Sequence, residues 1–482
     1  MEWYYALLLL LGTVCALMFL GLPVALAFFA ANVVGTWLFV GGDIGLIFMP
    51  MEFHNAIKFT LSPIALFLLM GEILLQTGVA FKAIGAIDRM ISRVPGRLSV
   101  VSVIGGTVFS SLSGSTIANT AILGSVLLPD MIRRGYAPAI AMGPIMAVGG
   151  IAMLIPPSAL AVLLASLAEQ SVAQLLIAGI VPGLLMAFLF LAYVVGRCML
   201  NPSLAPSYAP DESGLDEPLT VGLYGRGDRP IWQGRYQGAG LRLANRVLPF
   251  AFYILPLLFI FVVVVGSIFF KLAAPTEAAG LGCIASVVIC YVFRLFKSRI
   301  RISGIEGADF SWREIGKALM ETAKINTMIL FIIAGSLVFS QALSNSGATD
   351  GLLQQITALD LTPLTVVIIM MAVLLFLGAF MDQVSMLLLT LPFFLLGSQS
   401  LQAVFDIDVI WLMVLMLITM EISLLTPPFG LLLYVMKGVA QFNVTLGQIV
   451  MSAMPFILIE LLVLALLIAV PEVATWLPSR VD

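Results

Sequence analysis

Apolar runs of about 20 residues recur along the whole chain, and no other feature limits its fold as strongly. A helix of that length rises about 30 Å, which matches the hydrocarbon core of a bilayer. Of the 482 residues, 61% are hydrophobic and 10% are charged, whereas an ordinary soluble domain has about 25% charged residues. The sequence therefore predicts an all-α polytopic membrane protein. A net charge of −3 does not favour a polyanionic partner, so no nucleic acid is expected.

Hydropathy predicts a series of complete membrane spans. They are expected near residues 4–20, 22–41, 60–81, 137–165, 172–196, 247–270, 276–296, 320–345, 409–436 and 445–470. Two further apolar stretches, 98–129 and 361–396, are too long for one crossing and too short for two. Each has a small or polar break near its middle. We therefore expect both stretches to form re-entrant helical hairpins.

The charges that flank the two hairpins predict their orientation, because Lys and Arg concentrate in cytoplasmic loops. Basic residues flank the first hairpin on both sides: Arg93, Arg97, Arg133 and Arg134. Acidic residues flank the second hairpin: Asp350, Asp360, Asp406 and Asp408. The first hairpin is therefore expected to enter from the cytoplasm and the second from the opposite face.

An internal repeat supports this arrangement without using charge. The segment Phe67–Gly71 is echoed by Phe331–Gly335, 264 residues later, and the pair Pro156-Pro157 is echoed by Pro427-Pro428, 271 residues later. In the predicted topology the matching segments run in opposite directions. Two inverted repeats, each with a re-entrant hairpin and a helix broken at Pro-Pro, are typical of secondary transporters.

The repeat divides the chain into five parts. These are N-terminal scaffold helices (1–59), a first repeat (60–198, with hairpin 98–129 and broken helix 137–165), a polar cytoplasmic linker (199–246), scaffold helices of the second half (247–319), and a second repeat (320–482, with hairpin 361–396, broken helix 409–436 and final helix 445–470). The linker is either a partly ordered connection or a contact surface for a partner subunit.

The proline pairs mark candidate binding sites. They lie in the segments Ile155-Pro156-Pro157-Ser158 and Leu425-Thr426-Pro427-Pro428. Proline removes an amide donor and clashes with the carbonyl one turn earlier, so each pair should interrupt its helix and free carbonyl oxygens. Irregular backbone at membrane depth is tolerated where it is buried in protein or lines a cavity. A simple kink is the alternative, and the matching repeat positions argue against it.

The hairpin tips gather small polar groups. The first tip has Ser113-Gly114-Ser115-Thr116, followed by Asn119. Glycine permits the turn, and hydroxyls with turn carbonyls can replace the water around a hard cation such as Na⁺. Close helix packing by small residues is the alternative. The second tip offers Gly378, Asp382 and Ser385.

Acidic residues at membrane depth are costly and by default suggest function. Asp382, just behind the second tip, is expected either to bind a cation or to orient a helix. Glu421 is expected to make structural hydrogen bonds, and Glu460 to sit near a membrane interface. Neither hairpin contains Lys or Arg. The charge of an anionic substrate would therefore be met by bound cations, hydroxyls and helix N-termini, which favours cation coupling.

The order of several short motifs resembles the large membrane subunit of tripartite ATP-independent periplasmic (TRAP) transporters, over nearly the whole chain. The motifs are Leu69-Met70-Gly71-Glu72, Ser113-Gly114-Ser115, Arg134-Gly135-Tyr136, Ile155-Pro156-Pro157-Ser158, Pro275-Thr276-Glu277-Ala278-Ala279, Met381-Asp382 and Leu424-Leu425-Thr426-Pro427-Pro428-Phe429-Gly430. Two departures are a Thr at position 116, where the family often has Ser, and a long linker.

The resemblance implies a bacterial inner-membrane protein that imports an organic acid by sodium symport and an elevator motion. Implied partners are a periplasmic substrate-binding protein, a separate small four-helix membrane subunit and the lipid bilayer. No cofactor beyond the coupling ion is implied. Sodium is expected at Ser113, Ser115, Gly378, Asp382 and Thr426. The wider set of candidate ion- or substrate-binding residues adds Gly114, Thr116, Asn119, Ile155, Pro156, Ser385 and Pro427.

Two alternative functions for the sequence are considered beside transport by a tripartite system. The first is a standalone Na⁺- or H⁺-coupled carboxylate transporter of the same architecture, working without a binding protein. The second is an intramembrane hydrolase. His54 is the sole histidine, so a two-histidine zinc site cannot form, and no catalytic residues are expected.

Overall fold

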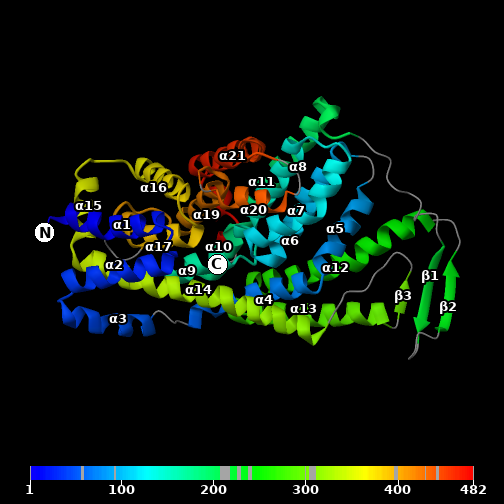
Figure 1. The fold of residues 1–482 in the computed structure, drawn as a ribbon, viewed down its shortest axis with the longest axis horizontal. Helices are drawn as coiled ribbons and strands as arrows, with labels where there is room; N and C mark the ends of the chain where they lie inside the picture. The colour runs from blue at the N-terminus through cyan, green and yellow to red at the C-terminus, as the bar shows by residue number, and fades with distance from the viewer. Residues whose placement is uncertain are drawn as a thin grey trace.

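The fold comes from a computed structural model of the chain, which describes residues 2–55, 59–91, 94–206, 218–224, 230–236, 241–298, 300–302, 311–395, 400–428, 430–440 and 444–480. The described part is mostly α-helical, as predicted, and elongated (Figure 1). Six of its segments are long and apolar enough to cross a membrane. These are Phe59–Gln76, Val172–Leu200, Leu241–Phe269, Pro275–Phe296, Trp312–Asn345 and Leu446–Ala469.

The first half begins with five helices. They are α1 (Trp3–Phe19), α2 (Val24–Phe39), α3 (Asp43–Asn55), α4 (Ser62–Gln76, after a 3-10 turn at Phe59–Leu61) and α5 (Val79–Met90). A helix–turn–helix follows, made of α6 (Arg97–Ser113) and α7 (Thr116–Arg133). Next come α8 (Pro138–Gly150), a 3-10 turn (Ile151–Met153), α9 (Ala159–Leu167), α10 (Val172–Ala178), α11 (Ile180–Leu200) and a 3-10 turn (Pro202–Leu204).

The second half has a similar order of elements. After α12 (Leu241–Phe269) and α13 (Pro275–Ser298) come α14 (Trp312–Asn345), α15 (Ala348–Thr357), and the helix–turn–helix α16 (Pro363–Gly378) and α17 (Gln383–Phe394). The chain continues through α18 (Leu401–Val404), α19 (Val409–Leu425), α20 (Leu431–Val439), α21 (Leu446–Ala469), α22 (Glu472–Thr475) and a 3-10 turn (Pro478–Arg480).

A small sheet departs from the all-α prediction. Strand β1 (Leu219–Tyr224) pairs antiparallel with both β2 (Pro230–Tyr236) and β3 (Ile300–Ile302), in the order β2-β1-β3. It lies at one end of the molecule, beyond α12 and α13 (Figure 1). The described part of the polar linker is therefore partly a β-hairpin.

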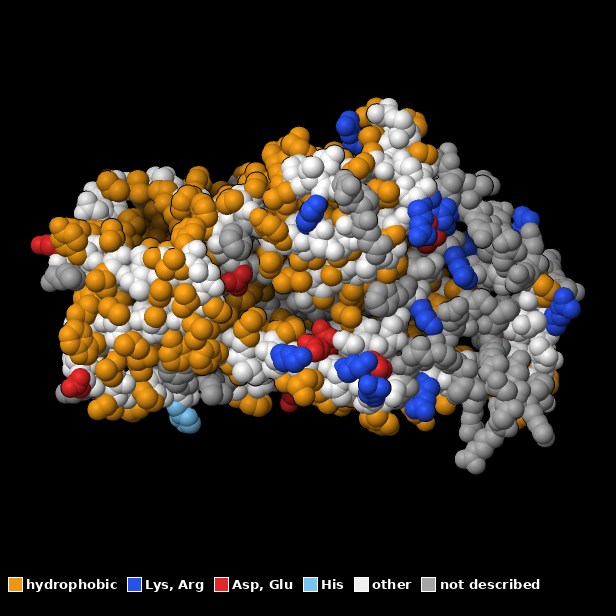
Figure 2. Space-filling view, viewed as in Figure 1, with side chains coloured by type: hydrophobic (Ala, Val, Ile, Leu, Met, Phe, Trp, Pro, Cys, Tyr) orange, Lys and Arg blue, Asp and Glu red, His pale blue; other side chains and the backbone are white. Residues whose placement is uncertain are grey.

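The two helix–turn–helix units approach the centre of the molecule from opposite ends of its long axis. In Figure 1, α6 and α7 lie toward the sheet, whereas α16 and α17 lie toward the N-terminus. Helix α14 runs along one side and packs on α2, α4 and α17. Figure 2 shows that on this face Lys and Arg side chains gather in the half that holds the sheet, while the other half is mostly hydrophobic.

Helices α8 and α19 form the centre of the core. Residues 140–150 of α8 and 411–425 of α19 are all buried. A helix that is apolar on every side is stable only when protein or lipid surrounds it completely. Both helices end at buried residues, Gly150 and Leu425, and a break follows each of them.

Candidate functional site

The first hairpin tip rests on the first helix break. Helix α6 ends at Ser113, and Gly114 turns the chain with a left-handed φ of +57°. The Ser115 hydroxyl oxygen caps α7 by accepting a hydrogen bond from the Ala118 amide at 3.4 Å. A Cβ on Gly114 would stand 3.2 Å from the Pro157 carbonyl oxygen. The lack of a side chain at Gly114 therefore lets the tip approach the proline pair.

The first break is buried and capped. After the 3-10 turn, Ser158 starts α9 by accepting a hydrogen bond from the Ala161 amide at 3.2 Å. Ile155 and Pro156 are buried. A Cβ on Gly179 would stand 2.2 Å from the Leu154 carbonyl oxygen, and one on Gly183 would stand 2.7 Å from Ile155 Cγ1. The lack of side chains at Gly179 and Gly183 thus lets the corner of α10 and α11 pack closely on this break.

The second tip is organised by Asp382. Its Oδ2 accepts hydrogen bonds from the amides of Val384 and Ser385 at 3.1 and 3.3 Å, and its Oδ1 accepts one from the Ser385 hydroxyl. Asp382 is thus the N-cap of α17. Of its two predicted roles, the described contacts show helix orientation.

The second hairpin also rests on a broken helix. A Cβ on Gly378 would stand 2.1 Å from Ser423 Cβ, near the end of α19. The Thr426 hydroxyl donates to the Ile422 carbonyl at 2.8 Å, and the Thr426 carbonyl accepts from the Gly430 amide at 3.0 Å. Pro427 is exposed. The two breaks therefore differ, since the first is buried and the second is partly open.

A cavity of about 270 Å³ lies between the two tips. The first tip contributes Gly114 to Ile117, the second contributes Asp382 to Val384, and one wall comes from α4 and α14. Gln383 also reaches the first break, where its Nε2 lies 3.4 Å from Met153 Sδ. The lining residues are Ile64, Leu68, Gly114, Ser115, Thr116, Ile117, Met153, Ala159, Leu160, Leu163, Ile325, Met328, Ile329, Asp382, Gln383, Val384 and Leu431.

Helices α7, α9, α17 and α20 all begin at residues that line this cavity. The amide groups of a first helical turn lack partners within the helix and carry partial positive charge, so a helix N-terminus favours an anion. Among the described lining residues, none is Lys or Arg, and Asp382 is the charged one. Any attraction of this cavity for an anion therefore has to come from backbone and hydroxyl groups or from bound cations.

Some of the predicted residues meet at the cavity and others do not. Gly114, Ser115, Thr116 and Asp382 line it. Asn119 is fully buried, and its Nδ2 donates to the Ser110 hydroxyl and to the carbonyls of Gly106 and Val148, so it ties α7 to α6 and α8. Five further candidates lie outside the lining: Ile155, Pro156, Gly378, Thr426 and Pro427. Ser385 supports Asp382. The side chain of Ser113 lies outside the described part of the structure.

Sequence reasoning missed the apolar wall of the cavity. Ile325, Met328 and Ile329 recur at helical spacing on α14, and Ile64 and Leu68 do so on α4. Such spacing marks one face of a helix. Within an apolar span that face looks like any other, so the sequence carried no signal for it.

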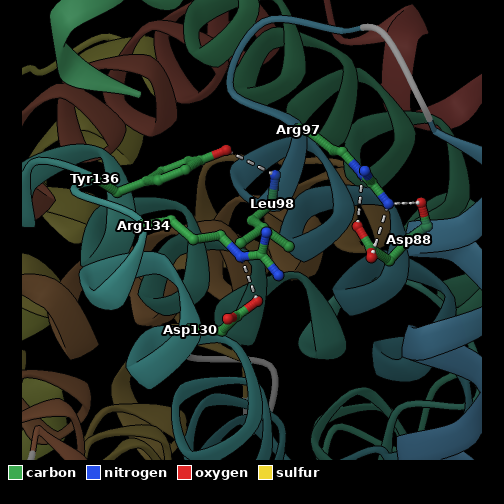
Figure 3. Close-up of polar contacts among 6 residues, drawn as sticks. All are labelled: Asp88, Arg97, Leu98, Asp130, Arg134 and Tyr136. Carbon is green, nitrogen blue, oxygen red and sulfur yellow. Dashed lines mark hydrogen bonds and ion pairs between the residues drawn. The ribbon is translucent and has the colours of Figure 1, made fainter. Parts of the chain in front are cut away.

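The base of the first hairpin is held by polar contacts (Figure 3). Arg97, at the start of α6, donates to the Asp88 backbone carbonyl at 2.7 Å and pairs with the Asp88 carboxylate, at 2.8 and 2.9 Å. The Leu98 amide donates to the Tyr136 hydroxyl at 3.3 Å. Burial raises the pKa of Asp88 above its usual value, and the Arg97 charge opposes that rise. Arg93, predicted at the same end, lies outside the described residues.

The polar groups at the hairpin tips are of the chemical type that binds a sodium ion. Sodium takes oxygen ligands, and the tips offer the Ser115 and Thr116 hydroxyls, the Asp382 carboxylate and the Pro157 carbonyl. In the described part of the chain no three His, Cys, Asp or Glu side chains gather as a metal cluster. The donors at the tips are therefore oxygen atoms, the ligand type of hard cations rather than of soft transition metals.

Known proteins resemble this chain over most of its length. Residues 11–473 match the family described as tripartite ATP-independent periplasmic transporter, DctM component. The C4-dicarboxylate TRAP transporter large permease protein DctM of Pseudomonas aeruginosa is 30% identical over 430 residues, covering 89% of this chain and 88% of that protein. The ectoine TRAP transporter large permease protein TeaC of Halomonas elongata is 26% identical over 471 residues, covering 97% and 98%. The fold is similar to that of the Alcanivorax borkumensis YdaH transporter, with a TM-score of 0.59, 13% identity and 91% of each chain covered.

Proposed function

The chain belongs to the DctM-component family of TRAP transporters, and from this premise we propose that it is the large transport subunit of a Na⁺-coupled importer of a small organic acid. It is a membrane transport protein, consistent with its long apolar helices. The proposal extends this family membership to the coupling ion, the substrate class and the mechanism.

The convergence of four helix N-termini on one cavity carries the proposal. An organic anion placed between the tips would face the amide ends of α7, α9, α17 and α20. The cavity volume of about 270 Å³ suits a small acid. Relatives are named for C4-dicarboxylate and ectoine transport, so one scaffold serves different small solutes.

The charges around the cavity support sodium coupling. The Asp382 carboxylate would repel a substrate carboxylate unless a cation stands between them. Sodium ions held by tip hydroxyls, the Asp382 carboxylate and carbonyls of the breaks would cancel that repulsion. The ions would then complete the anion site, so the substrate would bind tightly only after sodium.

Several pairs of elements support two inverted repeats. Left-handed glycines, Gly78 and Gly347, precede α5 and α15. The hairpin α6–α7 corresponds to α16–α17, and the broken helix α8–α9 corresponds to α19–α20. The hairpins approach from opposite ends (Figure 1). We place the bases of the first hairpin at the cytoplasmic face, where Lys and Arg side chains gather.

An elevator motion fits the two unlike walls of the cavity. The wall from α4 and α14 is apolar and carries Ile64, Leu68, Ile325, Met328 and Ile329. The facing wall carries the polar tips and the helix breaks. A loaded body of hairpins and broken helices can slide along an apolar wall without breaking substrate hydrogen bonds to it.

We infer two protein partners from the family: a periplasmic substrate-binding protein and a small four-helix membrane subunit. The location proposed is the bacterial inner membrane. The test is uptake of candidate acids by proteoliposomes that contain the chain and its small subunit, with and without a sodium gradient and the binding protein. Uptake that requires all of these components supports a transporter made of the large subunit, the small subunit and the binding protein.

Two outcomes would contradict parts of the proposal. Sodium-driven uptake without a binding protein would identify a standalone carrier of the same architecture. If Ser115→Ala and Asp382→Ala both show normal uptake with unchanged sodium dependence, the hairpin tips do not form the sodium site.

A further inference from the structure

Two carboxyl groups lie deep in the core, apart from the cavity lining. Glu421 in α19 and Glu460 in α21 are each 0% exposed. All four of their carboxyl oxygens lack a hydrogen-bond partner in the described part of the structure. The expectation that Glu421 makes structural hydrogen bonds is therefore wrong, whereas the expected place of Glu460 near a membrane interface stays a prediction. Helices α19 and α21, which carry the two groups, pack directly on each other.

The pair lies where the two broken helices cross. A Cβ on Gly150 would stand 2.4 Å from Glu421 Cγ and 2.6 Å from its Oε1, so Glu421 lies directly over Gly150. Gly150 is the last residue of α8, just before the first break. Glu421 itself is in the last turns of α19, before the second break. Helix α21, which carries Glu460, packs on both α8 and α19.

The surrounding helices carry few charged groups, and none of those described is hydrogen-bonded to the pair. The sequences of α8, α9, α10, α16 and α17 contain no ionisable residue. The ionisable residues on the remaining neighbours are Tyr193, Arg197 and Cys198 on α11, Tyr434 and Lys437 on α20, and Glu472 on α22. In the described structure none of them makes a hydrogen bond to either carboxyl group.

Two charged carboxylates are not stable in this environment. Each buried ion without a partner costs several kcal/mol, and a second like charge beside it adds repulsion. One proton changes this, because a protonated carboxyl becomes a donor and its neighbour can accept the hydrogen bond. A hard metal cation would call for about six oxygen ligands, whereas Glu421 and Glu460 bring four oxygens among apolar side chains.

We propose that Glu421 and Glu460 form a proton-binding site in which the two carboxyl groups share at least one proton at neutral pH. The proton joins α21 to α19 at the level of Gly150. Its release requires that α8 move off Glu421, so the protonation of the pair is linked to the packing of the broken helices. This inference goes beyond the proposed function and does not depend on sodium, the organic acid or the partner proteins.

Infrared spectroscopy of the purified full chain tests the proposal. The C=O stretch of a protonated carboxylic acid lies at a higher frequency than the amide I band. Incorporation of ¹³C-labelled glutamate shifts this stretch only when the acid is a glutamic acid. We expect a label-sensitive band at neutral pH in the wild-type chain. The double variant Glu421→Gln/Glu460→Gln, which keeps the side-chain size, is expected to lose it. The control Glu314→Gln removes a carboxylate that pairs with Lys317 on α14 and is expected to keep the band.

The measurement on wild-type protein tests the proposal even if the double variant does not fold. Absence of a labelled glutamic acid band from wild-type protein at neutral pH overturns the proposal. A band of undiminished intensity in a folded double variant also overturns it, because the proton would then belong to another glutamate. A band that is present in wild type and lost in the double variant supports it.

Discussion

Gly378 in the second hairpin lies directly against Ser423 in α19. A Cβ on Gly378 would stand 2.1 Å from Ser423 Cβ and 2.5 Å from its hydroxyl oxygen. This contact sets how deeply the hairpin sits on the broken helix, and hence where Asp382 stands relative to the cavity.

Gly378→Ala should therefore force α16 and α19 apart. Overpacking of a core typically costs about 1–3 kcal/mol, so we expect a lower thermal unfolding temperature and weaker sodium-driven uptake. Adding Ser423→Gly should restore both. Gly438→Ala is the control, since a Cβ there meets nothing within 4 Å. Equal behaviour of the two alanine variants would contradict the contact.

Substitutions of Asp382 can separate two effects of this residue, the capping of α17 and the negative charge of its carboxylate. Asp382→Ala removes both and should destabilise the start of α17 by about 0.5–2 kcal/mol. Asp382→Ser keeps a capping oxygen, so we expect near-normal thermal stability with a higher sodium concentration for half-maximal uptake. Asp408→Ala is a matched control, because Asp408 caps α19 through the Trp411 amide at 2.7 Å and does not line the cavity. It should lower stability without changing sodium affinity. An unchanged sodium affinity in Asp382→Ser would rule out a role for the charge.

The Asp88–Arg97 pair predicts a pH dependence of stability. Burial raises the pKa of Asp88 above 3.8, so the folded chain holds its proton more tightly than the unfolded chain does. This contribution is full below that value and is lost as the pH rises through the raised pKa. The unfolding temperature of wild type should therefore fall relative to that of Asp88→Asn as the pH increases. The opposite slope would mean that Arg97 outweighs burial and lowers the pKa.

The hairpins were predictable because length alone limits them. Stretches 98–129 and 361–396 fit neither one crossing nor two, and the glycines in their breaks, Gly114 and Gly378, lie at the tips seen in the structure. The short helices α5 and α15 were not predicted, because they are less apolar than a span. Strand β3 was missed because it pairs with β1 across the two helices between them, a contact that local sequence cannot signal.

The candidate site was predictable only in its polar half. Ser115, Thr116 and Asp382 stood out because polar residues are rare in this chain, and all three line the cavity. Asn119 stood out for the same reason, but its Nδ2 ties α7 to α6 and α8 and it does not line the cavity. The apolar wall carried no signal, since Met328 and Ile329 differ from their neighbours only in the direction they face. Whether a polar residue serves a site or a helix contact depends on tertiary structure.

The cavity can be tested by chemical labelling of its two walls. Gln383→Cys places a thiol at the second tip and Met328→Cys places one on α14, and both positions line the cavity. The native thiols of Cys198, Cys283 and Cys290 are buried, whereas Cys15 is partly buried, so Cys15→Ser is the background in which reaction with a small polar maleimide should be low. We expect both introduced thiols to react, and sodium together with a transported acid to slow the reaction severalfold. Met90→Cys, at the exposed end of α5, is the control and should react at the same rate with and without substrate. Equal protection at position 90, or none at 383 and 328, would place the substrate elsewhere.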